Sequence, residues 1–252
     1  MANFKKIGIW AVCLTMLLST VASCGGGDGD GDGTQASTEA ETEEVTPSEG
    51  LEYELNSDGQ SYTVTGIGTF NDKNLVIPNI HEGKSVVSIG DSAFEGCTSL
   101  TSIAIPDSVT SIGNRVFHGC TGLTSITIPD GVTSIGEYAF ANCWRLTSVT
   151  IPDSVMSIGD EAFEGCTSLT SITIPDSVTS IGYYAFEGCT GLTSVTIPDS
   201  VTSIGNWAFA DCTSLTTINY TGTQSQWNDI NKGTGWADYN NYYTINYNYV
   251  IE

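Results

Sequence analysis

The stretch Leu123–Arg145, LTSITIPDGVTSIGEYAFANCWR, recurs with little change through the middle of the chain. Its period is 23 residues, and two columns of identical residues mark it. They are the cysteines Cys97, Cys120, Cys143, Cys166, Cys189 and Cys212, and the pairs Ile105-Pro106, Ile128-Pro129, Ile151-Pro152, Ile174-Pro175 and Ile197-Pro198. A fixed period of this length predicts a solenoid, in which each unit buries its apolar edge against the next.

Each unit is predicted to contain short strands joined by tight turns. Leu123 to Ile128 supplies the inward residues of a first strand, and Pro129 ends it before an Asp-Gly or Asp-Ser turn. Val132 to Ile135 is typical of a second short strand. One helical turn carrying Ala139-Phe140 is then expected to close the unit.

The row Leu123-x-x-Ile126-x-Ile128 is the strand signature of leucine-rich repeats, and its continuation resembles the bacterial BspA-like surface variant of that family. The supporting Ala/Val-Phe pairs are Ala93-Phe94, Val116-Phe117, Ala139-Phe140, Ala162-Phe163, Ala185-Phe186 and Ala208-Phe209. The resemblance implies a right-handed leucine-rich-repeat solenoid, an α/β repeat rich in strand with single-turn helices. It also implies adhesion to host or neighbouring surfaces.

Shifts in composition predict five segments. Residues 1–23 form a lipoprotein signal peptide, 24–50 an acidic Gly/Asp/Glu/Thr tether, 51–90 an N-terminal cap, 91–219 the repeats, and 220–252 an aromatic C-terminal cap. In the N-terminal cap, the insertion from His81 to Ser85 lengthens the first interval from 23 to 28 residues. In the tail, Ile245 to Ile251 alternates like a final strand, which favours capping of the last unit over stacking on sugars.

The N-terminal segment has the features of an export signal. Lys5 and Lys6 precede an apolar run from Ile7 to Val21 that is short for a membrane span. Val21 to Cys24 resembles a bacterial lipobox, which implies that Cys24 is lipidated and anchors the protein to the outside of a bacterial membrane. The alternative is a secretory peptide cut at Ala22 or Ser23.

The charge of the chain excludes some partners. The net charge is −22, and removal of residues 1–23 leaves 5 basic against 29 acidic residues, or −24. Such a chain repels the phosphate backbone, so nucleic acid is not an expected partner. Contact with the membrane is expected through the lipid anchor only.

Three regular patterns could be taken for metal or cofactor sites. The cysteine column is interpreted as buried free thiols, because neighbouring Cβ atoms are expected slightly too far apart for a disulfide and no Cys-x-x-Cys or Cys/His cluster accompanies the column. The alternative is oxidation of one neighbouring pair. The column Asp107, Asp130, Asp153, Asp176 and Asp199 is explained by turn chemistry, with calcium binding as the alternative. Asp28 to Glu39 satisfies the EF-hand loop pattern, but low-complexity chance accounts for it better. No cofactor or metal is expected.

The outward residues of the first strands form a regular Ser-x-Thr ladder, as in Ser125/Thr127 and Ser148/Thr150. A regular hydroxyl array resembles the faces of ice-binding solenoids. The simpler interpretation is that threonine is a good residue for exposed strands.

Positions that depart from the repeat template are the candidates for ligand binding. They are Arg115, Tyr138, Trp144, Tyr184 and Trp207, residue types that are enriched among interface anchors. If the slots align, Arg115, Tyr138, Tyr184 and Trp207 share one column, which Glu161 interrupts. The alternative is that these side chains flank the core and pack over the phenylalanines.

No enzymatic motif is present: the chain has two histidines, no nucleophile elbow and no phosphate-binding loop. We therefore expect a non-enzymatic, lipid-anchored recognition protein that binds an extracellular protein or glycan. The alternative is a structural spacer or envelope component without a specific ligand.

Overall fold

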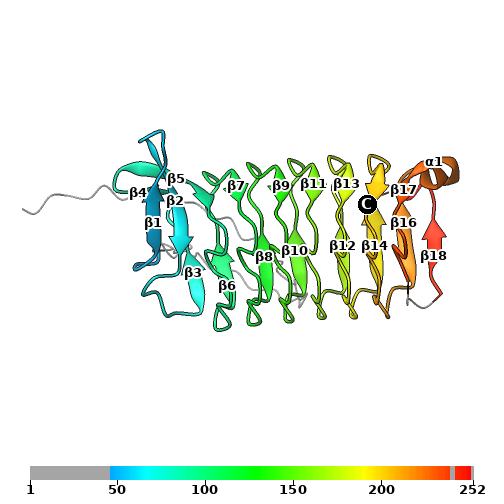
Figure 1. Cartoon of the computed structure of the whole chain (residues 1–252), viewed down its shortest axis with the longest axis horizontal. Helices are drawn as coiled ribbons and strands as arrows, with labels where there is room; N and C mark the ends of the chain where they lie inside the picture. The colour runs from blue at the N-terminus through cyan, green and yellow to red at the C-terminus, as the bar shows by residue number, and fades with distance from the viewer. Residues whose placement is uncertain (1–45, 239–241, 251–252) are drawn as a thin grey trace, which may run out of the picture. The chain divides into compact units, whose positions relative to one another are not determined.

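The computed structural model describes residues 46–238 and 242–250. Those from Pro47 onward form one compact unit, a β-solenoid whose successive turns, here called rungs, lie side by side (Figure 1). The predicted signal peptide, Cys24, the EF-hand-like loop and most of the predicted tether lie outside the described residues. The solenoid predicted from the 23-residue period is confirmed.

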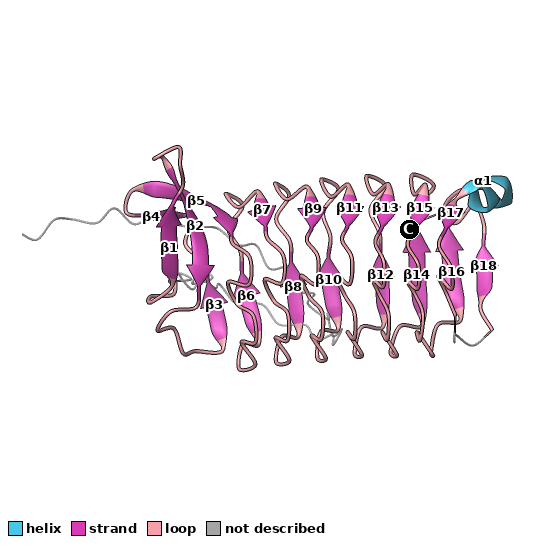
Figure 2. Cartoon of the chain, viewed as in Figure 1, coloured by secondary structure: helices cyan, strands magenta, loops and turns pink. Residues whose placement is uncertain are grey.

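The first strand of each rung lies on one side of the solenoid (Figure 2). These strands are β3 (Asn74–Val76), β6 (Ser102–Ala104), β8 (Ser125–Thr127), β10 (Ser148–Thr150), β12 (Ser171–Thr173), β14 (Ser194–Ile197), β16 (Thr217–Tyr220) and β18 (Thr244–Asn246). They run parallel and pair residue for residue, as in Ser148 with Ser125. The hydrogen-bonded ladder comes in three groups: β3–β6, β8–β10 and β12–β14–β16–β18.

The second strands pair in parallel in two groups, β5–β7 and β9–β11–β13–β15–β17. They are β5 (Lys84–Ile89), β7 (Ser111–Ile112), β9 (Ser134–Ile135), β11 (Ser157–Ile158), β13 (Ser180–Ile181), β15 (Ser203–Ile204) and β17 (Asn231–Lys232). In each two-residue strand from β7 to β15 the isoleucine is buried and the serine points outward. Alternation along the strand places the serine and the isoleucine on opposite faces. The valine three residues before the isoleucine precedes the strand and is also buried, as at Val132.

Where the sequence predicts one helical turn per rung, the chain makes consecutive tight turns instead. Two residues of each of these segments have positive φ, as in Glu161 (56°) and Gly165 (66°), so a right-handed helix cannot continue through them. Among the described residues, the α-helix is α1 (Gln224–Asp229), which begins at a capping box between Thr223 and Gln226.

The core is a column of stacked phenylalanines. From Phe94 to Phe209 each ring stacks on the next, with centroids 5.0–5.7 Å apart and planes within 5–14°. Beside them lies the cysteine column, whose thiols are free; Cys97 is partly exposed and the other five are buried. Each buried thiol donates a hydrogen bond to the phenylalanine carbonyl of the preceding rung, as from Cys143 to Phe117 at 3.1 Å. Burial raises the pKa of Cys143 and of Cys212 to about 12, so both stay protonated at neutral pH.

Both ends of the stack are covered. At the N-terminal end, β1 (Glu52–Leu55), β2 (Ser61–Gly66) and β4 (Ile80–His81) join β5 in the order β1-β2-β5-β4. The predicted insertion forms the β4–β5 hairpin. At the other end, Trp236 contacts Phe209 and Trp227 edge to face, and Trp227 meets Tyr220, so aromatic rings cover the last phenylalanine.

We predict that Phe163→Ala lowers the free energy of unfolding by about 3–5 kcal/mol, because it leaves a cavity in a fully buried stack. Phe163 has 0% exposure and stacks at 5.2 Å on both sides. Chemical denaturation measures the change, and Tyr242→Ala, at a fully exposed ring, serves as the control. An unchanged denaturation midpoint for Phe163→Ala would contradict this account of the core.

Candidate functional site

The residues that interrupt the template lie in one row along the turns that follow the second strands. We call Ser92, Arg115, Tyr138, Glu161, Tyr184 and Trp207 the irregular column. Equivalent backbone hydrogen bonds link their rungs, for example from Tyr138 N to Asp160 O (2.9 Å) and from Tyr184 N to Asn206 O (3.0 Å). The structure therefore aligns the four candidates Arg115, Tyr138, Tyr184 and Trp207, with Glu161 between them.

All six residues of the irregular column have positive φ, between 52° and 56°. This left-handed conformation costs a residue with a side chain about 1–2 kcal/mol, whereas glycine adopts it freely. The same turns contain a second column with positive φ, and there the residues are those that tolerate it. They are Gly96, Gly119, Asn142, Gly165, Gly188 and Asp211. The backbone conformation thus explains the residue types in the second column. It does not explain why arginine, tyrosine and tryptophan occupy the irregular column.

Side chains of the irregular column contact one another along the solenoid. The guanidinium of Arg115 lies over the ring of Tyr138, 4.2 Å from its centroid. The Tyr138 hydroxyl donates to a Glu161 carboxylate oxygen at 2.5 Å, and this bond raises the pKa of Tyr138. Tyr184 and Trp207 stack with centroids 5.2 Å apart and planes 12° from parallel. The alternative was that these rings pack over the core phenylalanines. The ring contacts are instead between members of the irregular column, Tyr184 with Trp207 and Arg115 with Tyr138.

Trp207 differs from the rest because the C-terminal cap lies against it. A Cβ atom at Gly235 would lie 2.6 Å from Nε1 of Trp207, and the Trp207 side chain is half-buried. Part of the role of Trp207 is therefore to pack against the C-terminal cap. A substitution of Tyr184 therefore tests the irregular column more directly than a substitution of Trp207.

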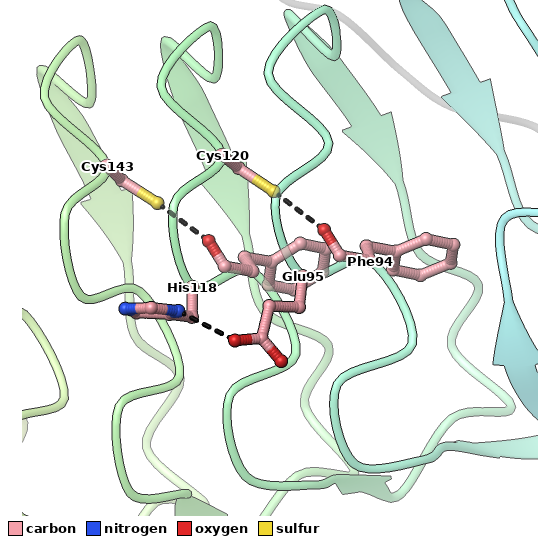
Figure 3. A network of polar contacts seen from close by, with 6 residues as sticks. Phe94, Glu95, His118, Cys120 and Cys143 are labelled. Atoms are coloured by element: carbon pink, nitrogen blue, oxygen red, sulfur yellow. Dashed lines mark hydrogen bonds and ion pairs between the residues drawn. The ribbon is translucent and has the colours of Figure 1, made fainter.

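Carboxylates surround the irregular column. Burial raises the pKa of Glu164, and the neighbouring carboxylates of Glu161 and Glu187 raise it further. Burial, followed by Asp211 and Glu161, raises the pKa of Glu187. At the N-terminal end of this row, His118 Nδ1 lies 3.0 Å from Glu95 Oε1 (Figure 3). The surface beside the column is thus negative, apart from Arg115 and the partly exposed His118.

Trp144 lies outside the irregular column. It is 54% exposed and occupies a row that is threonine on other rungs, such as Thr121 and Thr167. Its indole N–H donates to Asn142 at 3.4 Å. The sequence candidates thus form one aligned group and one separate exposed ring.

Within the repeats, two further large apolar or aromatic side chains are exposed. Met156 is 56% exposed and Tyr183 is 50% exposed. Met156 replaces the threonine of the Val-Thr-Ser-Ile strand, so the same search for departures from the template could have found it. Tyr183 directly precedes Tyr184 of the irregular column.

Within residues 46–238 and 242–250 the side chains offer no group of three His, Cys, Asp or Glu arranged to hold a metal ion. Over the same ranges, no helix combines the length and apolarity needed to cross a membrane. The chemistry of the irregular column is that of noncovalent contact, through rings, one guanidinium and carboxylates.

The comparisons with known proteins agree with the solenoid fold. The model of the BspA type leucine-rich repeat region matches residues 63–149 and 133–234, in six copies. The chain belongs to this family. Membership suggests a role in protein interaction or adhesion, and BspA-type repeat proteins are typically binding or structural proteins rather than enzymes.

Solved structures of bacterial leucine-rich repeat proteins resemble this BspA-type chain. One from T. pallidum is 32% identical with a TM-score of 0.67, covering 75% of this chain and 85% of that one. One from Bacteroides ovatus is 26% identical with a TM-score of 0.55, covering 75% of this chain and 67% of that one. No curated protein matches the chain.

We predict that Tyr184→Gly is more stable than Tyr184→Ala by about 0.5–1 kcal/mol, because only the alanine variant keeps the cost of positive φ. Thermal and chemical denaturation of the two variants measure the difference. At Thr127, an extended position on β8, the order should reverse and the alanine variant should be the more stable. Equal stabilities at position 184 would show that the backbone there is not left-handed.

Proposed function

We propose that this BspA-type protein is a lipid-anchored recognition protein of the cell surface, and that its irregular column binds an extracellular protein. The observation that carries the proposal is the presence of large side chains at five of the six positive-φ positions of the irregular column, where glycine would adopt the conformation without cost. Strained residues of this kind concentrate at functional sites. Aromatic residues and arginine are also the types that most often dominate interface energies.

The arrangement of the rings favours a protein over a glycan. A sugar stacks on an open aromatic face, but Tyr184 and Trp207 close the faces between them. Arg115 covers one face of Tyr138 in the same way. These side chains therefore present ring edges, hydroxyls and N–H groups to a partner, rather than open ring faces. The raised pKa values of Glu164 and Glu187 reflect burial and crowded carboxylates, which a basic partner surface would relieve.

The first experiment screens the labelled protein against matrix proteins, mucins and glycans. Saturable binding to a protein is expected. For that ligand, Arg115→Gly/Tyr184→Gly should weaken binding by more than about tenfold, or about 1.4 kcal/mol, without unfolding, since glycine suits both positions. Tyr242→Ala, in an exposed ring of the tail, is the matched control and should bind normally.

Three other outcomes would change the assignment. Absence of saturable binding to any class would favour the spacer. Binding that survives loss of both side chains would move the site to Trp144, to the Ser/Thr strand face or to the tail. Binding to glycans alone would contradict the choice of a protein partner.

The anchor gives a separate prediction. Cys24→Ala should release the protein from the membrane or leave an unprocessed precursor, because the thiol that carries the lipid is gone. Cell fractionation and mass spectrometry of the N-terminus measure this, with Cys13→Ala as the control. An unacylated wild-type N-terminus at a residue other than Cys24 would exclude the anchor.

A further inference from the structure

The outer edge of β18 is the open C-terminal end of the first strands. Among the described strands, β18 pairs with β16 on one edge and with none on the other. Thr244 N donates to Thr216 O at 2.8 Å, so the backbone groups of Thr244 bond to β16. In a parallel ladder, successive residues turn their N–H and C=O to opposite neighbours. The N–H and C=O of Ile245 therefore point away from β16, toward the end of the solenoid.

The elements of the C-terminal cap leave this edge uncovered. β17 pairs with β15, and Phe209 N donates to Trp236 O, so β17 and the turn around Trp236 belong to the same rung as β16. α1 connects β16 to β17. Among the described elements, β18 alone belongs to the rung after these, and Figure 1 shows it at the end of the solenoid. The rings of the cap thus cover the phenylalanine stack but not the strand edge.

The inward side chains of β18 and its flanks are only partly covered. Tyr243, Ile245 and Tyr247 pack against the core and keep part of their surface exposed. Ile218, which pairs with Ile245 on the preceding rung, is fully buried. The edge therefore combines unpaired backbone groups with incompletely buried apolar groups. An exposed edge of this kind is a template for a strand from another chain.

The sequence of the edge has the same pattern in both directions. Residues 243–247 are Tyr-Thr-Ile-Asn-Tyr, which is aromatic, polar, aliphatic, polar and aromatic around Ile245. Two copies of this segment therefore match when they pair antiparallel. Ile245 then lies opposite Ile245 of the second copy, and each Tyr243 lies opposite a Tyr247. Aliphatic and aromatic side chains that face each other in this way stabilise an antiparallel pair.

The outward side chains also match in this register. Thr244 lies opposite Asn246 of the second copy, and both residues are exposed in the single chain. The Asn246 amide N–H donates to Asn219 Oδ1 at 2.9 Å, which leaves Asn246 Oδ1 to accept the threonine hydroxyl of the other copy. Residues 242–250 contain no charged side chain, although the chain has a net charge of −22. Two copies can thus meet at this edge without like charges directly opposed.

Other strand edges do not offer an equivalent contact. The outer edge of β3, at the N-terminal end of the first strands, is already occupied. Ser48 N donates to Val76 O, and Val76 N donates to Ser48 Oγ, both at 2.9 Å. β1 belongs to the sheet of the second strands, and it carries Glu52 and Glu54. A contact of β18 with β18 uses the same surface on both copies, so it closes as a dimer and does not extend into a fibre.

We propose that β18 pairs antiparallel with β18 of a second copy, centred on Ile245. Ser48 lies at the opposite end of the solenoid, so the two N-terminal ends point away from each other (Figure 1). With the lipid anchor proposed above, this arrangement joins copies on two facing cells, and only this last step rests on the proposed function. The contact is small and weak in solution, and many copies on facing surfaces reinforce it.

Self-association is measured by sedimentation velocity of the mature chain, residues 24–252, up to about 1 mM. A dimer is expected at the higher concentrations, and more of it as salt screens the repulsion between the negative chains. The ¹⁵N NMR amide signals of Ile245 and Tyr247 should shift over the same series, and that of the buried Ile218 should not. A monomer throughout would overturn the proposal. So would binding of the peptide acetyl-Tyr-Thr-Ile-Asn-Tyr-amide without self-association, which would assign the edge to a different protein.

The register is tested by two variants of the same exposed residues. Thr244→Glu/Asn246→Glu opposes like charges across the pair and should weaken self-association by about tenfold or more. Thr244→Lys/Asn246→Glu opposes a lysine to a glutamate at both places and should associate at least as well as the wild type. Ser125→Glu/Thr127→Glu adds the same charge on β8 and is the matched control, which should associate normally. Equal association of the two Thr244/Asn246 variants would overturn the antiparallel pairing.

The facing arrangement is tested with two dye-labelled cell populations that display the full chain. Thr244→Glu/Asn246→Glu cells and Thr244→Lys/Asn246→Lys cells should aggregate when mixed, and neither population should aggregate alone. Absence of mixed aggregates would overturn the arrangement on facing cells. Arg115→Gly/Tyr184→Gly should leave self-association in solution unchanged. Failure of the irregular column or of the lipid anchor is thereby distinguished from failure of the β18 contact, because the solution dimer needs neither.

Discussion

The stack of phenylalanine rings, one per rung, sets the geometry of the whole solenoid. Ring centroids 5.0–5.7 Å apart match the roughly 4.8 Å spacing of paired strands, so one translation satisfies both the core and the ladders. Every unit must return its phenylalanine to this position after 23 residues. The tight turns with two residues of positive φ make that return possible in so short a segment, and a helix of ordinary length would not fit.

Much of this could be read from the sequence because a repeat multiplies each signal. Ile126 alone is ambiguous, but an isoleucine or valine in the same slot on six rungs identifies an inward column. Burial of the phenylalanine and cysteine columns could be predicted for the same reason. The alignment of Arg115, Tyr138, Tyr184 and Trp207 also followed from spacing alone, since equal intervals place residues in one row.

The sequence could not predict the backbone conformation of the irregular column or the pairing between individual strands. Glycine at positions 96, 119, 165 and 188 hints at positive φ, but Tyr184 and Trp207 give no such hint, because propensity argues against that conformation for large residues. The missing pairing between β10 and β12 is equally hidden: β10 is Ser-Val-Thr and β14 begins with the same three residues, yet only β14 is paired on both edges. Pairing depends on how whole rungs tilt, which no single column encodes.

The side-chain hydrogen bonds between rungs have a direction. Cysteine thiols, threonine hydroxyls and serine hydroxyls all donate to a carbonyl of the preceding rung, as from Cys166 to Phe140, Thr193 to Thr170 and Ser177 to Val155. For these side-chain bonds, each unit therefore offers donors to the preceding unit and acceptors to the following one. Duplication or deletion of one whole unit in the gene would rejoin matching sides, so such proteins can change length by recombination while these repeated thiol and hydroxyl donors keep a carbonyl partner.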